Sequence, residues 1–207
     1  ANDYLRSIPE GGGSTPIDIR SSTEFSELSD HINHMTQEID EKSRQLYELS
    51  SRDALTGLYN RIGFENVMAE VQKDQSSVLH SAVLMVDADG LKYINDTYGH
   101  EQGNMAIKKL CHIVCEVFKK SPVFRIGGDE FLAVVQGEDY ENRERLFKDF
   151  MERQTGNEII SSTPWEDLSM AAGMAVYDPA SDKETDEVLS RADKLMYENK
   201  RLFHNSR

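Results

Sequence analysis

The sequence has few cysteines, no long apolar run and fewer basic than acidic residues, and each shortage excludes a class of protein. No stretch approaches the roughly 18 consecutive apolar residues that a membrane-spanning helix needs, and no apolar segment follows a basic start as in a secretory signal. The 23 lysines and arginines against 37 aspartates and glutamates give a net charge of −14. Nucleic acid polymers would be repelled by this charge. We therefore expect a soluble chain that does not bind nucleic acid polymers.

The two cysteines, Cys111 and Cys115, are predicted to be buried thiols. They lie four residues apart in a segment whose apolar residues, from Ile107 to Phe118, have helical spacing. A zinc site would need further ligands, and His112 would point about 100° away on such a helix. The pair indicates core thiols in a reducing compartment.

An apolar stripe with heptad spacing predicts a coiled-coil helix near the N-terminus. Steps of three and four residues join eight positions, of which seven are apolar: Phe25, Leu28, Ile32, Met35, Ile39, Lys42, Leu46 and Leu49. A stripe this narrow is typical of a coiled coil, and it predicts a homodimer through this helix. The alternative is an amphipathic helix packed on its own domain.

From Ser51 onward, the pattern changes to strands alternating with helices. Apolar runs predict strands at 82–86, 123–125, 131–135 and 168–177. Helical spacing predicts helices at 103–120, 142–153 and 184–202. This order predicts an α+β domain with a central mixed sheet wrapped by helices. We divide the chain into an N-terminal unit, 1–50, and this domain, 51–207.

Two groups of carboxylates follow the predicted strands. Asp87-Ala88-Asp89 stands at the exit of strand 82–86, before a glycine and a helix start, where carboxylates are well placed to hold a metal. Taken alone, these acids are more typical of a solvated turn. Gly127-Gly128-Asp129-Glu130 forms the tip of a predicted hairpin, where we expect the glycines to adopt positive φ and to let a nucleotide approach the backbone. Adjacent carboxylates repel each other, so this second group favours a divalent cation.

The segment Gly127-Gly128-Asp129-Glu130-Phe131 is the signature after which GGDEF domains are named, and the chain resembles that family. Four other stretches match the family in order: Asp53 through Arg61, Asp87 through Asp96, Gly99-His100 with Gly103, and Ala192-Asp193 with Tyr197 and Lys200. The resemblance covers 51–205. It implies a fold related to the palm of nucleotidyl cyclases and polymerases, and a diguanylate cyclase that joins two GTP molecules into cyclic di-GMP and releases pyrophosphate.

The resemblance also implies roles for the matched residues. Two Mg²⁺ per active site, or Mn²⁺, would be held at four positions: Asp87, Ala88, Asp129 and Glu130. Catalytic roles fall to three: Asp129, Glu130 and Lys92. Asp129 would accept the 3′-hydroxyl proton, and Lys92 would stabilise charge developing on the phosphates. Substrate contacts are implied at eight positions: Gly90, Leu91, Asn95, His100, Asn104, Gly127, Gly128 and Lys200.

A second resemblance concerns the N-terminal unit. The stretch from Pro16 to Met35 resembles the second half of a HAMP signalling module, and such modules usually follow a membrane span. It implies the cytoplasmic output part of a membrane-anchored receptor, joined to the membrane only through a segment outside this chain. In the GGDEF family, each of two facing domains holds one GTP, which implies a homodimer.

Three departures from the family pattern bear on activity. Asn104 stands where aspartate is usual, and Phe203-His204 replaces a glycine-arginine pair. Phe118-Lys119-Lys120-Ser121 replaces the Arg-x-x-Asp site of product inhibition, so we expect only weak inhibition by cyclic di-GMP. The first two departures keep open a catalytically weak domain that acts as a nucleotide-binding regulatory module. A dimerising scaffold that binds no nucleotide is the third interpretation.

Overall fold

Four strands form one sheet in the order β2-β3-β1-β4: β1 Ser81–Asp89, β2 Val123–Arg125, β3 Glu130–Gln136 and β4 Ser169–Val176. The computed structural model describes residues 23–71, 79–155, 169–182 and 185–205. All three strand pairs are antiparallel, so the α+β class is confirmed but the sheet is not mixed. The reason is the path of the chain. After β1 two helices carry it to the edge strand β2, and the hairpin then returns β3 between β2 and β1.

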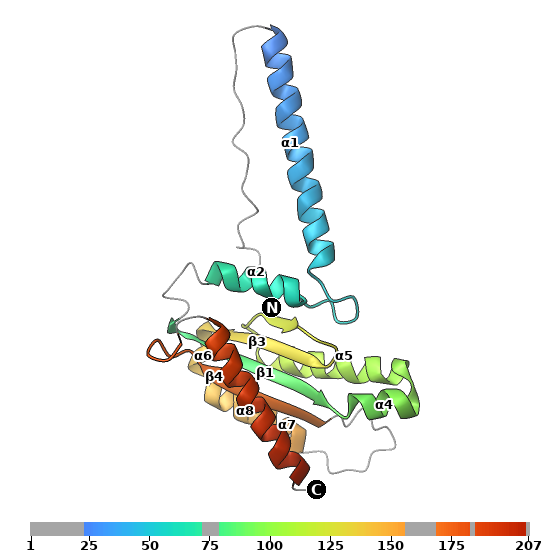
Figure 1. Ribbon diagram of the computed structural model, residues 1–207, viewed down its shortest axis with the longest axis vertical. Coiled ribbons are helices and arrows are strands. Elements are labelled where there is room, and N and C mark those ends of the chain that lie inside the picture. Colours follow the sequence, from blue (N-terminus) through green and yellow to red (C-terminus); the bar gives the residue numbers. More distant parts are fainter. Residues whose placement is uncertain (1–22, 72–78, 156–168, 183–184, 206–207) are drawn as a thin grey trace.

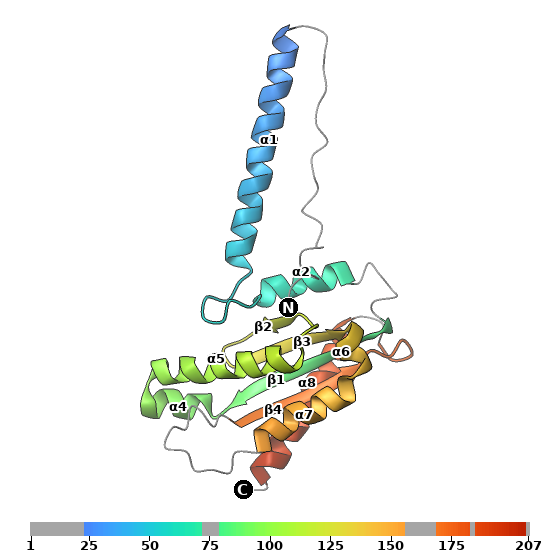
Figure 2. The same ribbon diagram turned by 180° about the vertical axis from the view of Figure 1, so that it is seen from behind.

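Helices cover both faces of the sheet (Figures 1 and 2). On one face lie α2 Arg61–Val71 and α8 Thr185–Asn205, and on the other lie α5 His100–Val117 and α7 Arg143–Thr155. Successive side chains of β1 alternate between the two cores, with Met85 on the α2–α8 side and Leu84 on the α5–α7 side. Since β1 is buried on both faces, its sequence is a continuous apolar run.

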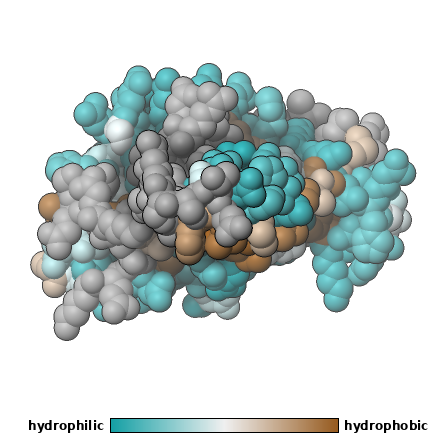
Figure 3. Space-filling view, turned by 90° about the horizontal axis from the view of Figure 1, so that it is seen from above, coloured by the Kyte–Doolittle hydropathy of each residue, from teal (hydrophilic) through white to brown (hydrophobic). Residues whose placement is uncertain are grey.

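The N-terminal helix α1, Thr23–Ser50, rises away from the sheet (Figure 1). The seven apolar residues of its stripe, called the α1 stripe below, are 38% to 78% exposed. Figure 3 looks down on this end, and a band of hydrophobic surface there lies beside hydrophilic surface. The stripe is therefore uncovered by its own domain, which contradicts the alternative of an amphipathic helix packed there.

Part of the HAMP-like stretch, 16–22, lies outside the described residues, and its remainder forms the start of α1. Of the helices that the structure describes, none combines the length and apolar character needed to cross a membrane.

The side chain of Asn60 joins α1 to the domain. Its Nδ2 donates a hydrogen bond to the carbonyl of Ser50, the last residue of α1 (2.7 Å). Its Oδ1 accepts one from the amide of Ile62 in the first turn of α2 (2.9 Å). In the loop that joins the two helices, the guanidinium of Arg52 lies 3.8 Å from the ring centroid of Tyr59. One asparagine thus satisfies backbone groups at the end of one helix and the start of the next.

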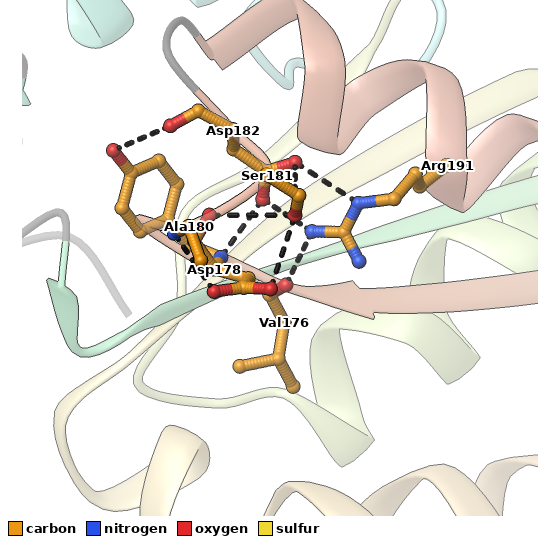
Figure 4. A network of polar contacts seen from close by, with 7 residues as sticks. Val176, Asp178, Ala180, Ser181, Asp182 and Arg191 are labelled. Carbon is orange, nitrogen blue, oxygen red and sulfur yellow. Dashed lines mark hydrogen bonds and ion pairs between the residues drawn. The ribbon is translucent and has the colours of Figure 1, made fainter.

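A polar network fixes the start of α8 against the end of β4 (Figure 4). The carboxylate of Asp182 accepts hydrogen bonds from the Arg191 guanidinium and from the amide of Asp178. Arg191 also donates to the carbonyl of Val176 (2.6 Å). Further along the strand, a Cβ on Gly173 would collide with the backbone of α8 at Ala192 and Met196. These features hold α8 close to the sheet, so its last turns reach the end of β1.

Candidate active site

The end of β1 and the start of β3 bring carboxylates together. Asp87 is directly opposite Glu130 in the antiparallel pair. The amide of Ala88 donates a hydrogen bond to the carbonyl of Asp129 (3.0 Å). Because side chains alternate along a strand, Asp87 and Glu130 lie on the face that α8 covers. The four residues predicted as metal ligands therefore lie side by side where the central strands β1 and β3 meet at one end of the sheet, called the active-site edge below.

Burial and the surrounding carboxylates raise the pKa of Glu130. Burial has the largest effect, followed by the negative charges of Asp129, Asp87 and Asp193, while Arg61 partly opposes them. Both burial and neighbouring carboxylates disfavour the ionised form. The site thus carries more negative charge than its cationic neighbours neutralise, which favours binding of a cation.

Lys200 of α8 contacts this cluster directly. Its ammonium donates a hydrogen bond to Oδ1 of Asp87 (2.6 Å) and lies 3.5 Å from Oδ1 of Asp89. Burial alone would lower the pKa of Lys200, but the two aspartates outweigh burial and raise it. The family resemblance implies a phosphate contact for Lys200, whereas the structure places its ammonium against the carboxylates of Asp87 and Asp89.

The hairpin between β2 and β3 forms as predicted, but Gly127 and Gly128 do not adopt the positive φ expected of them. The amide of Ile126 donates to the carbonyl of Glu130 (3.0 Å), which closes the turn. Positive φ occurs at Gly90 (78°), whereas Gly127 and Gly128 are not among the residues with positive φ in the described chain. A Cβ on Gly127 would lie 2.5 Å from Oε2 of Glu130. Gly127 therefore leaves room for the Glu130 carboxylate.

An ion pair supports the same hairpin from the loop after α1. Arg125 donates to both carboxylate oxygens of Asp53 (3.0 and 3.1 Å) and to the carbonyl of Gly128 (2.6 Å). Burial would raise the pKa of Asp53, but hydrogen bonds from Thr56 and Arg125 lower it. Arg125 thereby fixes the backbone just before Asp129.

The predicted nucleotide contacts lie beyond the end of β1, on α4 Leu91–Tyr98 and α5. Helix α4 begins directly after Gly90, so its first amides, which lack partners within the helix, lie next to the end of β1. The half-buried side chain of Asn95 lies against Gly103 of α5, where a Cβ would collide with it. Asn104 follows Gly103 directly. The structure therefore places Asn95 against α5 at the position one residue before Asn104.

Other predicted contacts on these helices are less constrained. Lys92, His100 and Asn104 are exposed, while Leu91 is half-buried and packs against the α5–α7 core. Lys92 lies in the first turn of α4 and His100 is the first residue of α5. The side chains of Lys92, His100 and Asn104 therefore face solvent.

The residues fit a hard divalent cation. The ligands that the chain offers, carboxylates and the carbonyl of Ala88, are all oxygens, which Mg²⁺ and Mn²⁺ prefer. Within the described parts of the chain, no three acidic, histidine or cysteine side chains converge into a ready-made metal cage. Magnesium commonly uses one or two carboxylates plus water and substrate phosphates, so a full protein cage is not required.

Two contributors were not assigned a site role from sequence. They are Arg125, which holds the hairpin, and Asp193, which acts on Glu130. Asp89, which the sequence groups with Asp87, pairs with Lys200. The Asp53–Arg125 bond joins residues 72 positions apart, and the Asp87–Lys200 bond joins residues 113 apart. No local pattern signals such long-range pairs.

Comparison with known proteins identifies relatives of this chain. The family model described as "Diguanylate cyclase, GGDEF domain" matches residues 50–206. Diguanylate cyclase DgcS of Shewanella oneidensis is 30% identical over 162 residues, which cover 74% of this chain and 50% of that protein. Diguanylate cyclase VdcA of Vibrio cholerae is 27% identical over 209 residues, covering 91% and 56%. The chain therefore spans about half the length of these curated relatives.

Solved structures show the same fold. The coiled coil and GGDEF domain of DgcB from Caulobacter crescentus, solved with c-di-GMP, matches with a TM-score of 0.65 at 21% identity. That match covers 87% of this chain and 95% of that one, and α1 fits its coiled coil. A GGDEF-only fragment of TpbB (YfiN) from Pseudomonas aeruginosa matches with a TM-score of 0.58 at 25% identity, covering 73% and 89%. Because the family match spans well over half of the sequence, the chain belongs to the GGDEF family of diguanylate cyclases.

Proposed function

We propose that this chain condenses two GTP molecules into cyclic di-GMP and two pyrophosphates as the output domain of a signalling receptor. The observation that carries the proposal is the pairing of Asp87 with Glu130 at the edge of the sheet, next to the start of α4. This places acidic oxygen ligands beside helix amides that suit phosphate.

Asp87, the carbonyl of Ala88, Asp129 and Glu130 would hold Mg²⁺. When bound, Mg²⁺ supplies positive charge that stabilises the transferring phosphoryl group and the leaving pyrophosphate. Asp129 accepts the proton of the 3′-hydroxyl as that oxygen attacks the α-phosphate of the second GTP. Lys92 offsets the negative charge that develops on the phosphates.

The remaining predicted residues position the substrate. Amides of Gly90 and Leu91 donate to the phosphates, and Gly127 and Gly128 let the nucleotide approach the hairpin. The guanine edge and the terminal phosphates are contacted from the helices, by Asn95, Asn104, His100 and Lys200. One chain holds one GTP, so two chains must face each other, and the α1 stripe supplies the means of pairing them.

The test is incubation of the protein with GTP and Mg²⁺, followed by chromatographic detection of cyclic di-GMP. Wild type should form the product and Glu130→Gln should not. A protein that binds GTP in a thermal-shift titration but forms no product would instead be the nucleotide-binding regulatory module, which Asn104 and Phe203-His204 leave open. Absence of both binding and product would leave only the scaffold.

A further inference from the structure

Lys200 contacts the same carboxylate cluster that is proposed to bind the metal. Its ammonium lies 2.6 Å from Oδ1 of Asp87 and 3.5 Å from Oδ1 of Asp89. Only 30% of the lysine side chain and 13% of each aspartate side chain is exposed. The lysine thus uses an oxygen of Asp87, which is also a proposed metal ligand.

We propose that Lys200 is a tethered cation that occupies the carboxylate cluster until a divalent metal and a nucleoside triphosphate enter together, and that it then leaves Asp87 for the triphosphate. The inference rests on the proposed function, because it concerns the same metal and nucleotide. It adds that the metal and the triphosphate bind cooperatively, and that Lys200 produces part of this cooperativity.

The coupling follows from charge. Two cations held at one carboxylate oxygen repel each other, and the repulsion is stronger in a partly buried site than in water. A metal that enters alone must therefore displace Lys200 and leave its ammonium without these anionic partners. When a triphosphate enters as well, the displaced ammonium gains a new anion. Because linkage is reciprocal, metal and triphosphate then each strengthen binding of the other.

The displacement needs no change of fold. Lysine carries its charge on a flexible four-carbon chain, and Lys200 lies near the C-terminal end of α8, which ends at Asn205. The helix itself is held elsewhere, by the Asp182–Arg191 network at its start and by the bond from Asn199 Nδ2 to the carbonyl of Ala172 (2.7 Å). A change of side-chain rotamer is therefore sufficient.

The test is direct binding of Mn²⁺, measured by electron paramagnetic resonance without nucleotide. Lys200→Met should bind Mn²⁺ about tenfold more tightly than wild type, because a charge-assisted hydrogen bond no longer competes. Lys200→Arg keeps the charge and should bind as weakly as wild type. Lys194→Met, an exposed lysine of the same helix, is the matched control and should not differ from wild type. A non-hydrolysable GTP analogue should strengthen Mn²⁺ binding more in wild type than in Lys200→Met.

A second measurement uses wild type alone and does not depend on a variant that folds. Saturating Mn²⁺ without nucleotide should speed acetylation of Lys200 by acetic anhydride, followed by peptide mass spectrometry, and leave Lys194 unchanged. Equal Mn²⁺ affinity in wild type and Lys200→Met, or unchanged acetylation of Lys200, would overturn the inference even if wild type makes cyclic di-GMP. Absence of Mn²⁺ binding in every protein, with or without the analogue, would overturn both the inference and the proposed metal site.

Discussion

At the scale of single residues, Asp87 combines several constraints. It is a buried carboxylate at the end of a central strand, opposite Glu130, and is hydrogen-bonded to Lys200. A hydrophobic residue would avoid the desolvation cost that the Asp87 carboxylate bears even when it is paired with Lys200. A carboxylate that is retained at this cost is a candidate for function.

We therefore expect Asp87→Ala to abolish turnover while the domain stays folded. Loss of a ligand from a metal site removes several kcal/mol of charge stabilisation, so activity should fall at least about a hundredfold. Initial rates of cyclic di-GMP formation, with thermal unfolding as a check of folding, measure the effect. A folded variant that keeps more than about a tenth of wild-type activity would remove Asp87 from the proposed mechanism.

Asn104 is the sharpest departure from the family pattern. Guanine presents two adjacent donors, N1–H and the 2-amino group, and one carboxylate can accept from both. An asparagine offers one acceptor oxygen, which costs about 1–3 kcal/mol of recognition. Asn104→Asp should therefore raise kcat/KM for GTP and widen the preference over ATP, by about 5- to 150-fold.

Steady-state kinetics with GTP and ATP on wild type and Asn104→Asp test this expectation. The neighbouring Met105 is exposed, so Met105→Leu serves as a matched control that should leave the GTP/ATP ratio unchanged. A lower or unchanged ratio in Asn104→Asp would mean that the guanine edge is read elsewhere.

At the scale of helices and strands, apolar patterns predicted the elements that are buried and regular. The strand 82–86 corresponds to β1, and the strands 123–125 and 131–135 correspond to β2 and β3. The final helix, expected at 184–202, spans Thr185–Asn205. These elements were predictable because each buries apolar residues at the spacing that is typical of its helix or strand.

Two of the helices that the structure describes, α2 and α6, were not predicted from the sequence. In α2, the first turn includes Ile62 and Gly63, and glycine is a poor helix former, so the apolar pattern was masked. The other, α6 Gly137–Glu141, is only five residues long, too short for a periodic signal.

The hairpin between β2 and β3 was predictable, but the requirement for glycine at position 127 was not. A larger residue there would collide with the Glu130 side chain, and this contact exists only once the turn has folded.

The anchor of α8 yields a prediction about pH. Burial would raise the pKa of Asp182, but the hydrogen bonds from Arg191 and Asp178 lower it below the unfolded value of 3.8. A carboxylate whose pKa is lowered on folding stabilises the protein above its unfolded pKa, and this contribution is lost as pH falls below about 3.8 toward the folded pKa. Asp182 is 1% exposed and Arg191 is 41% exposed, so the pair is partly screened.

Asp182→Asn should therefore lower the free energy of unfolding by about 1–3 kcal/mol at pH 7. The difference from wild type should shrink as pH falls from 5 to 3. Urea unfolding at a series of pH values measures it, with Asp186→Asn in the first turn of the same helix as control. A difference that stays constant or grows toward acid pH would show that the ion pair is not its cause.

At the scale of the whole molecule, the α1 stripe and the active site both require a second copy of the chain. Each domain is proposed to hold one GTP, and the exposed stripe offers a surface on which a second α1 packs. A coiled coil would hold two domains at high effective concentration, so activity should persist on dilution.

Met35→Lys combined with Ile39→Lys should therefore lower specific activity at sub-micromolar protein and make it depend more steeply on concentration. Gln37→Lys, on α1 but off the stripe, is the matched control, and removal of residues 1–50 should resemble the double variant. Analytical ultracentrifugation over the same dilution series reports the dimer. Equal specific activity for all four proteins at every concentration would contradict the proposed role of α1.

The central claim is that two GTP molecules are joined symmetrically at the Asp87–Glu130 edge. The most direct measurement is the ratio of pyrophosphate released to cyclic di-GMP formed, under initial-rate conditions with GTP and Mg²⁺. The proposed reaction predicts two pyrophosphates per cyclic di-GMP in wild type, and neither product above background in Glu130→Gln. Pyrophosphate without cyclic di-GMP, or undiminished product from Glu130→Gln, would contradict the claim.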